Sequence, residues 1–201
     1  MKVNEFKNRL LNGCRQIIAE EDILTQIDSR FGDADHGLTM HKVAQAISDA
    51  VAEPAETIKA LLDNVAEKVG ILNGGSAIPL WTSLLQGMAD VAPDSDEVDA
   101  EGLKQIFGNG LEEFDFMSGA KVGDKTIMDA LKPAVDAMQE AADDDALFKE
   151  AARAAMDGAE KTKEFTARFG RAKSFGEKTL GTPDAGALSM ASFFKGLAEK
   201  E

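Results

Sequence analysis

The chain of 201 residues has no tyrosine, one cysteine and two histidines. The single cysteine, Cys14, cannot form a disulfide within the chain, so cysteine usage gives no sign of an oxidising compartment. One cysteine with two histidines also leaves no basis for a zinc site. The sequence shows no ordered set of serine, histidine and aspartate of the kind that a nucleophilic hydrolase uses.

The sequence also lacks long hydrophobic runs and an excess of positive charge. No uninterrupted apolar stretch approaches the roughly 20 residues that span a membrane, and the opening MKVNEFKNRLLNGC lacks the apolar core of a secretory signal. We therefore expect a cytoplasmic protein. The net charge of −14 argues against nucleic acid as the main partner, since phosphate backbones bind clustered lysine and arginine. An anionic ligand would need a local positive site or a metal ion.

Apolar residues at helical spacing are abundant. Phe6, Leu10 and Cys14 recur in this way near the N-terminus, and no strand-like alternation persists elsewhere. Further helices are predicted over residues 41–52, 57–73, 77–92, 99–117, 124–142, 145–168 and 184–199. Pro133 is expected to kink its helix, because it removes a backbone donor. We predict an all-α fold of about eight helices, in a single domain over residues 1–201.

Unusual polar and glycine-rich segments separate these helices at four places. They cover residues 28–39, 73–79, 119–126 and 171–186. In an up-and-down helical array, alternate loops lie at the same end. Loops commonly carry function while helices carry packing, so the four segments are expected to build a site together.

The first of these segments crowds three carboxylates, Asp28, Asp33 and Asp35, around the start of a helix. Their spacing does not fit an EF-hand, and carboxylates without cysteine suit a hard ion, most commonly Mg²⁺. One or two Mg²⁺ with a polyphosphate would explain the crowding. The alternative is helix capping, which accounts well for Asp35 alone and poorly for all three. His36 is a candidate catalytic or ligand residue, whereas His41 is expected at the surface.

The other three segments have features of anion sites. In NGGSAIP, residues 73–79, two glycines before a helix let the backbone approach a ligand and leave helix N–H groups free. SGAKVGDKT, residues 118–126, is close to a phosphate-binding P-loop, but its glycine spacing is short and no strand precedes it. There Asp124 is expected to cap a helix. In the basic segment after Phe169, Arg171 offers a fork for phosphate and Asp184 is expected to cap the last helix.

Together these motifs resemble the ADP-binding L subunit of dihydroxyacetone kinase, the DhaL family. The resemblance runs in order over nearly the whole chain and its length matches the separate subunit. It implies an antiparallel eight-helix barrel with a nucleotide and two Mg²⁺ at one end. The motifs are Asp28-x4-Asp33-x-Asp35-His36-Gly37, then Gly74-Gly75 with Pro79, then Gly123-Asp124-Lys125-Thr126, then GRAKSFGEKTLGTPDAGA from Gly170.

The resemblance also implies roles for individual residues. Asp28, Asp33 and Asp35 would hold the two Mg²⁺ ions that bridge the phosphates. Ser76 and Ala77 would approach the phosphates, and other residues would line the adenine side or close the site. The complete nucleotide set is His36, Gly37, Leu38, Thr39, Ser76, Ala77, Gly119, Ile127, Arg171, Asp184, Ala185 and Gly186.

One motif departs from the family pattern. The family loop usually runs Gly-Gly-Ala-Ser-Gly-Pro, whereas residues 74–79 of this chain read Gly-Gly-Ser-Ala-Ile-Pro. Because its side chain is β-branched, Ile78 would resist any positive φ required there. Thr39 stands where the family often has asparagine, a milder change.

Bacterial members of this family keep ADP bound as a phosphoryl relay. A phosphohistidine carrier subunit charges it to ATP, and a separate dihydroxyacetone-binding kinase subunit presents the ketose. The resemblance therefore implies a kinase subunit acting on dihydroxyacetone or a similar short ketose, with neither nucleic acid nor membrane as partner. Two alternatives are an ATP-dependent kinase subunit for another ketose such as erythrulose, and a non-catalytic, nucleotide-bound partner of a transcription regulator.

Overall fold

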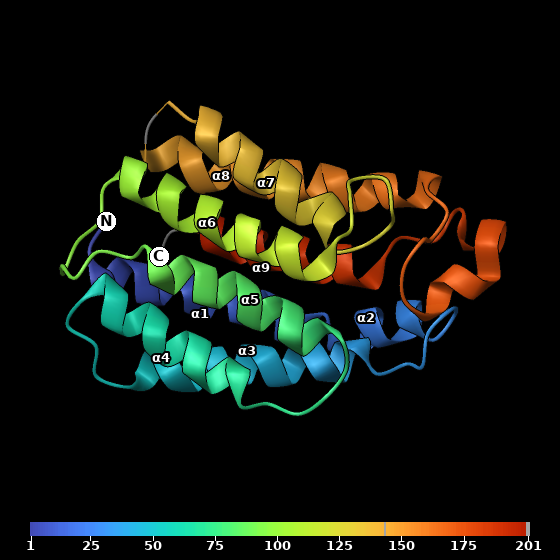
Figure 1. Cartoon of the computed structure of the whole chain (residues 1–201), viewed down its shortest axis with the longest axis horizontal. Helices are drawn as coiled ribbons and strands as arrows, with labels where there is room; N and C mark the ends of the chain where they lie inside the picture. Colours follow the sequence, from blue (N-terminus) through green and yellow to red (C-terminus); the bar gives the residue numbers. More distant parts are fainter. Residues whose placement is uncertain (143, 200–201) are drawn as a thin grey trace.

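The computed structural model describes residues 1–142 and 144–199, and this part of the chain is almost entirely helical (Figure 1). Its elements in chain order are α1 (Val3–Ala19), α2 (Glu21–Asp28), α3 (His36–Ala52), α4 (Ile58–Gly70), α5 (Ala77–Asp90), α6 (Ala100–Ser118), α7 (Met128–Glu140), α8 (Asp144–Lys161), the 3₁₀ segments η1 (Thr162–Glu164) and η2 (Arg171–Thr179), and α9 (Ala185–Ala198). The predicted all-α fold is confirmed.

The long helices form a closed antiparallel ring. From α3 to α9, each helix packs against the next along the chain, while α1 packs against both α3 and α9 and closes the ring. The short helix α2 lies outside this sequence of eight and packs on α3 and α9 at one end. The expected eight-helix barrel is therefore present within the described residues, with α2 added to it.

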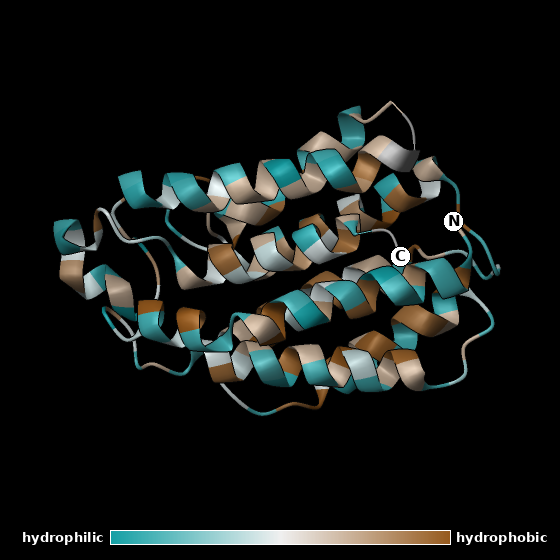
Figure 2. Cartoon of the chain, turned by 180° about the vertical axis from the view of Figure 1, so that it is seen from behind, coloured by the Kyte–Doolittle hydropathy of each residue, from teal (hydrophilic) through white to brown (hydrophobic). Residues whose placement is uncertain are grey.

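Apolar side chains fill the inside of the ring. Trp81 and Phe193 meet edge to face with ring centroids 5.2 Å apart, and Phe107 lies 5.9 Å from Phe148. Full burial of one such side chain contributes about 1.5–3 kcal/mol, so these aromatic contacts stabilise the packing of distant helices. Hydrophilic and hydrophobic residues alternate along the helices in Figure 2, as the periodicity predicts. Among the described helices, none combines the length and apolar character that a membrane span requires.

Two predicted helix boundaries are wrong. The predicted helix over 124–142 begins only at Met128, because Gly123 and Lys125 have φ of 99° and 63° and break a helical path. Asp124 therefore does not cap α7, and its side chain accepts a hydrogen bond from Lys121 N instead. The predicted helix over 145–168 ends earlier, at Lys161. By contrast, Asp184 caps α9 as predicted, accepting from Ala187 N at 2.8 Å.

The four polar segments meet at one end of the ring. The connections before α3, α5, α7 and α9 all lie at the end that α2 covers, on the right in Figure 1. Both chain termini lie at the other end, where the Met1 ammonium donates to Val98 O at 2.6 Å. The antiparallel topology thus brings together segments that are far apart in sequence.

Candidate functional site

A cavity of about 470 Å³ opens at the end of the ring where these connections meet. That volume lies within the range of about 300–1,000 Å³ typical of small-molecule sites. All four polar segments contribute to its wall. The predicted site residues that line it are Asp28, Asp33, Asp35, His36, Thr39, Ser76, Ala77, Ile127, Arg171, Asp184, Ala185 and Gly186.

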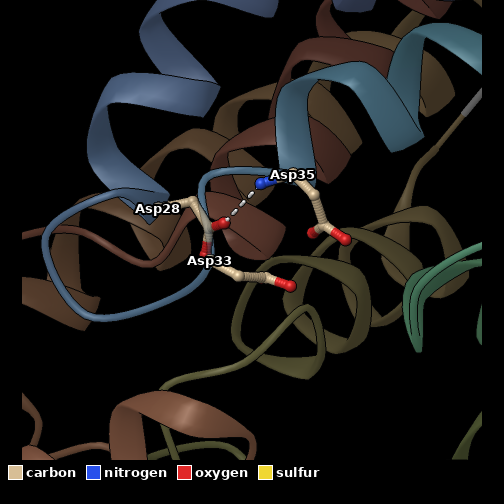
Figure 3. A group of neighbouring side chains, drawn as sticks. All are labelled: Asp28, Asp33 and Asp35. Carbon is tan, nitrogen blue, oxygen red and sulfur yellow. Dashed lines mark hydrogen bonds between the residues drawn. The ribbon is translucent and has the colours of Figure 1, made fainter.

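The three carboxylates predicted to bind metal lie together on one side of this cavity. Asp28 ends α2, while Asp33 and Asp35 follow in the loop to α3 (Figure 3). One oxygen of each lies within 4.8 Å of the others. Between them Ala34 has a φ of 61°, an unusual conformation for a residue with a Cβ. Such backbone strain costs about 1–3 kcal/mol and is commonly retained where a functional geometry demands it.

Helix capping does not explain Asp35. Its side chain makes no capping hydrogen bond within the described part of the chain, although Asp35 occupies the N-cap position of α3. Asp28 caps that end of the helix, accepting from Asp35 N at 3.1 Å (Figure 3) and also from His36 N at 3.4 Å. The capping alternative thus applies to Asp28, and the carboxylates of Asp33 and Asp35 require another explanation.

The electrostatics of the cluster favour a bound cation. Burial raises the pKa of Asp35, as do the neighbouring Asp33 and Asp28 carboxylates, while Arg171 acts in the opposite direction. Arg171 also forms an ion pair with Asp33. Oxygen donors at this spacing, without nitrogen or sulfur ligands, match the preference of Mg²⁺. The residues present therefore fit a magnesium site, and a cation there would relieve the repulsion among the carboxylates.

The start of α3 forms the adjoining wall. His36 Nε2 lies 3.1 Å from Ser189 Oγ, and burial lowers the pKa of its imidazole, with nearby Asp28 opposing the shift. Thr39 is buried one turn further along. Gly75 lies beside the acidic cluster, since a Cβ placed on it would be in van der Waals contact with Asp35 Oδ2 at 3.4 Å.

Ile78, the departure from the family loop, is accommodated without strain. It lies within α5, and the residues with positive φ in the described ranges are all elsewhere. Its side chain is buried, with Cδ1 lying 2.6 Å from where a Cβ on Gly74 would stand. Ser76 directly precedes α5 at the cavity wall. The positive φ that Ile78 would resist is therefore absent at this position.

The opposite wall is the start of α9. Burial raises the pKa of Asp184 to about 7. Gly186 packs against Ile127, since a Cβ on it would lie 2.7 Å from Ile127 Cγ1. Together with Ala185, these residues give the cavity a small-residue face beside an apolar side chain, which suits a flat ring.

Three predicted residues do not line the cavity. A Cβ on Gly37 would lie 2.1 Å from Thr25 Oγ1, so this glycine serves packing between α2 and α3. Leu38 is 50% exposed. Gly119 ends α6 with a φ of 61°, and it is the neighbouring Ser118 and Ala120 that line the cavity. His41 is half-exposed, as expected, and pairs with Glu21 at 2.5 Å.

Sequence reasoning missed several residues of the wall. Phe31, Phe169 and Lys125 all line the cavity. Lys125 is only 5% exposed, and its ammonium donates to Thr162 O at 2.5 Å and Thr182 O at 2.6 Å. The near match to a P-loop did mark this lysine, but nothing local indicated burial.

The comparisons with known proteins agree with this geometry. The DAK2 domain model matches residues 30–199. The ADP-binding subunit DhaL of PEP-dependent dihydroxyacetone kinase 1 from Listeria innocua is 33% identical over 198 residues, covering 96% of this chain and 94% of that subunit. The L-erythrulose 1-kinase of Mycolicibacterium smegmatis is 38% identical over 197 residues, and this chain spans only 34% of its length.

A solved structure supports the same relationship. The crystal structure of the dihydroxyacetone kinase from C. freundii in complex with AMP-PNP and Mg²⁺ superposes with a TM-score of 0.73 at 26% identity. It covers 98% of this chain, which corresponds to 34% of that longer protein. The chain therefore belongs to the DAK2 domain family, and within it matches an ADP-binding DhaL subunit of dihydroxyacetone kinase along almost its whole length.

Proposed function

We propose that the chain is the ADP-binding subunit of a dihydroxyacetone kinase that depends on the phosphotransferase system. It relays a phosphoryl group from a phosphohistidine carrier, through bound ADP and ATP, to dihydroxyacetone or a similar short ketose. The observation that carries the proposal is the cluster of Asp28, Asp33 and Asp35, within 4.8 Å of one another on the wall of a nucleotide-sized cavity. The near full-length match to a separate ADP-binding subunit supports it.

Asp28, Asp33 and Asp35 would hold two Mg²⁺ ions. When bound, these ions neutralise phosphate charge and orient the phosphoryl group for in-line transfer. The chain's own residues prepare that site: Asp28 accepts from two backbone N–H groups at the start of α3, and Ala34, with its φ of 61°, turns the backbone between Asp33 and Asp35. The three carboxylates supply part of the negative charge that balances two divalent cations, and the nucleotide phosphates would supply the rest.

The remaining wall residues would bind the nucleotide. The N-terminal ends of α3, α5 and α9 border the cavity, and free N–H groups at helix N-termini favour anions. Ser76 and Ala77 would contact the phosphates, while Ile127, Ala185 and Gly186 would contact the base. Arg171 would close the site, since it already reaches across the cavity to Asp33. Phosphoryl transfer depends mainly on such positioning and charge neutralisation, so no protein nucleophile is required.

The ketose would be supplied by a second subunit. The chain spans about a third of the length of the erythrulose kinase and of the C. freundii enzyme, and it matches a separate ADP-binding subunit along almost that subunit's whole length. We propose a dihydroxyacetone-binding kinase subunit and a phosphohistidine carrier subunit as partners. Activation of the ketose hydroxyl would then fall to the partner that binds the ketose.

The proposal is tested by the nucleotide content of the purified protein. The chain is purified without added nucleotide, denatured, and the released ADP or ATP is quantified, with and without earlier Mg²⁺ chelation. Near-stoichiometric ADP that chelation removes is the expected result. Protein that holds no nucleotide and binds none when Mg²⁺ and ADP are added would contradict the proposal.

A second candidate is an ATP-dependent kinase subunit for erythrulose, favoured by the 38% identity to L-erythrulose 1-kinase. Exchange of bound ADP with labelled ATP distinguishes the two. A relay subunit keeps its nucleotide through many phosphoryl transfers, whereas an ATP-dependent kinase exchanges it at every turnover. Exchange as fast as turnover would favour the second candidate.

A further inference from the structure

The buried ammonium of Lys125 joins both ends of one long connection. Its Nζ donates to Thr162 O at 2.5 Å and to Thr182 O at 2.6 Å. Between these two carbonyls lie residues 163–181, here called the strap, which carry most of η1 and all of η2. Gly181 N also donates to Lys163 O at 2.8 Å, so the two ends of the strap lie side by side.

The carbonyls that Lys125 binds belong to the same network as the start of α9. Thr162 Oγ1 accepts from Asp184 N at 2.8 Å, and the Asp184 carboxylate caps α9. The ammonium therefore binds the chain at two places: where the strap begins after α8, and where it ends at the cavity wall. Displacement of Thr162 or Thr182 would be transmitted directly to Asp184.

Holding the Lys125 side chain in this position is energetically unfavourable. Its φ is 63°, and burial lowers the pKa of its ammonium, with the carboxylates of Asp184 and Asp129 opposing that shift. Asp129 holds the loop on both sides of the lysine, accepting from Gly123 N at 2.6 Å and Thr126 N at 2.7 Å. A left-handed backbone and a buried charge are both unfavourable, so their combination indicates a role that an apolar residue would not fill.

The strap in turn covers the acidic side of the cavity. Arg171 pairs with Asp33, and the Phe175 ring lies 5.3 Å from that of Phe31. Directly after the strap, Thr182 Oγ1 accepts from Arg30 Nη1 at 3.4 Å. These three contacts join the strap to the loop between α2 and α3. The placement of the strap therefore decides how the acidic cluster is covered.

We propose that Lys125 is a positioning residue that anchors both ends of the strap and thereby slows the escape of nucleotide from the cavity. The anchoring is independent of the ligand, whereas the effect on escape rests on the function proposed above. Lys125 acts through Thr162 and Thr182 and needs no contact with the nucleotide.

The test uses the full chain with Lys125→Gly, because glycine accepts the positive φ at this position. Two rates are measured: tryptic cleavage within the strap, which contains Lys163, Arg168, Arg171, Lys173 and Lys178, and release of the N-methylanthraniloyl derivative of ADP in the presence of Mg²⁺. Both are expected to rise about tenfold, because two hydrogen bonds to a charged donor are lost. Added n-butylamine, which matches the deleted side chain, is expected to restore part of each effect.

Lys121→Ala is the matched control. Lys121 lies in the same loop, but its side chain is 71% exposed and pairs with Asp115 at 3.1 Å. The control is expected to leave both rates close to those of the unaltered chain. Should Lys125→Gly fail to fold, Lys125→Met keeps the stem of the side chain and removes the charge, and the same two rates are expected to rise.

The outcomes separate the two proposals. Faster strap cleavage without nucleotide binding by the unaltered chain would support the anchor and contradict the nucleotide function. A folded Lys125→Gly or Lys125→Met chain with unchanged strap cleavage would overturn the anchor, and so would an equal effect of Lys121→Ala. Faster cleavage with unchanged release would overturn the link between the strap and nucleotide escape.

Discussion

Arg171 and Asp33, which are distant in sequence, form an ion pair across the mouth of the cavity. The guanidinium belongs to the strap and the carboxylate to the cluster that we assign to Mg²⁺. A metal ion and a guanidinium would both be attracted to this carboxylate, and phosphate oxygens would attract the guanidinium in turn. The pair therefore couples the position of the strap to the charge of the acidic cluster.

Asp33→Asn is expected to weaken nucleotide binding strongly. The amide removes one negative charge from the cluster and the partner of Arg171 at the same time. We expect the affinity for ADP in the presence of Mg²⁺ to fall on the order of 100-fold, as measured by isothermal titration calorimetry. The control is Asp63→Asn, an exposed residue on α4 paired with Lys59. Unchanged Mg²⁺-dependent affinity would refute the metal assignment.

Arg171→Ala is expected to weaken ADP binding while leaving the free energy of unfolding almost unchanged. The Arg171 side chain is 68% exposed, and such exposed ion pairs contribute about 0–1 kcal/mol. The free energy of unfolding without nucleotide should therefore change little, while ADP binds about tenfold more weakly because a phosphate contact is lost. Arg171→Lys should recover only part of that affinity, since lysine lacks the planar fork. Urea denaturation and calorimetry on the same samples provide the comparison, and equal losses in both measurements would contradict it.

Asp184 is expected to make the chain less stable as pH rises. Burial raises its pKa from 3.8 to about 7, so between these values the folded state holds a proton that the unfolded chain has released. Where the folded state binds more protons, the free energy of unfolding decreases with increasing pH. Asp184→Asn keeps a capping side chain and removes this titration. In urea denaturation without nucleotide, the variant should gain stability relative to the unaltered chain between pH 5 and pH 8.

A parallel pH dependence in the two proteins would show that Asp184 does not titrate in this way. The comparison reports on Asp184 because the other acids whose pKa is raised, Asp35 and Asp129, are present in both chains. The pKa of each is also raised chiefly by burial. Asp129 also raises the pKa of Asp184 by charge repulsion, so the difference between the two proteins reports the titration of Asp184 together with its coupling to Asp129.

Ala34→Gly is expected to stabilise the chain. Ala34 has a φ of 61°, which costs an L-residue with a Cβ about 1–2 kcal/mol relative to glycine. Gly119→Ala is the matched opposite change, because Gly119 has the same φ of 61° and nothing lies within 4 Å of an added Cβ. Urea denaturation should show the first variant gaining about 1 kcal/mol and the second losing about as much. Changes of the same sign would refute strain at Ala34.

Local pattern was sufficient for the long helices of the ring, apart from two of their boundaries, and for one of the caps, but it did not reveal the short helix α2. Helices form where apolar residues recur every three or four positions, and that signal needs only the neighbouring residues. Asp184 was identified as a cap for the same reason, because an N-cap and the backbone N–H that donates to it lie three residues apart. The order of the motifs along an antiparallel array then placed the acidic, glycine-rich and basic segments at one end.

Long-range contacts decided what local pattern could not. Asp28, not Asp35, satisfies the start of α3, because α2 turns its last carboxylate toward those N–H groups. Lys125 is buried because Thr162 and Thr182 present carbonyls to it from across the end of the ring. By itself, the sequence determined the helical class and the residue types that meet at the site. Only the tertiary structure decided which carboxylates stay available and which charge is buried, because both depend on partners far apart in the chain.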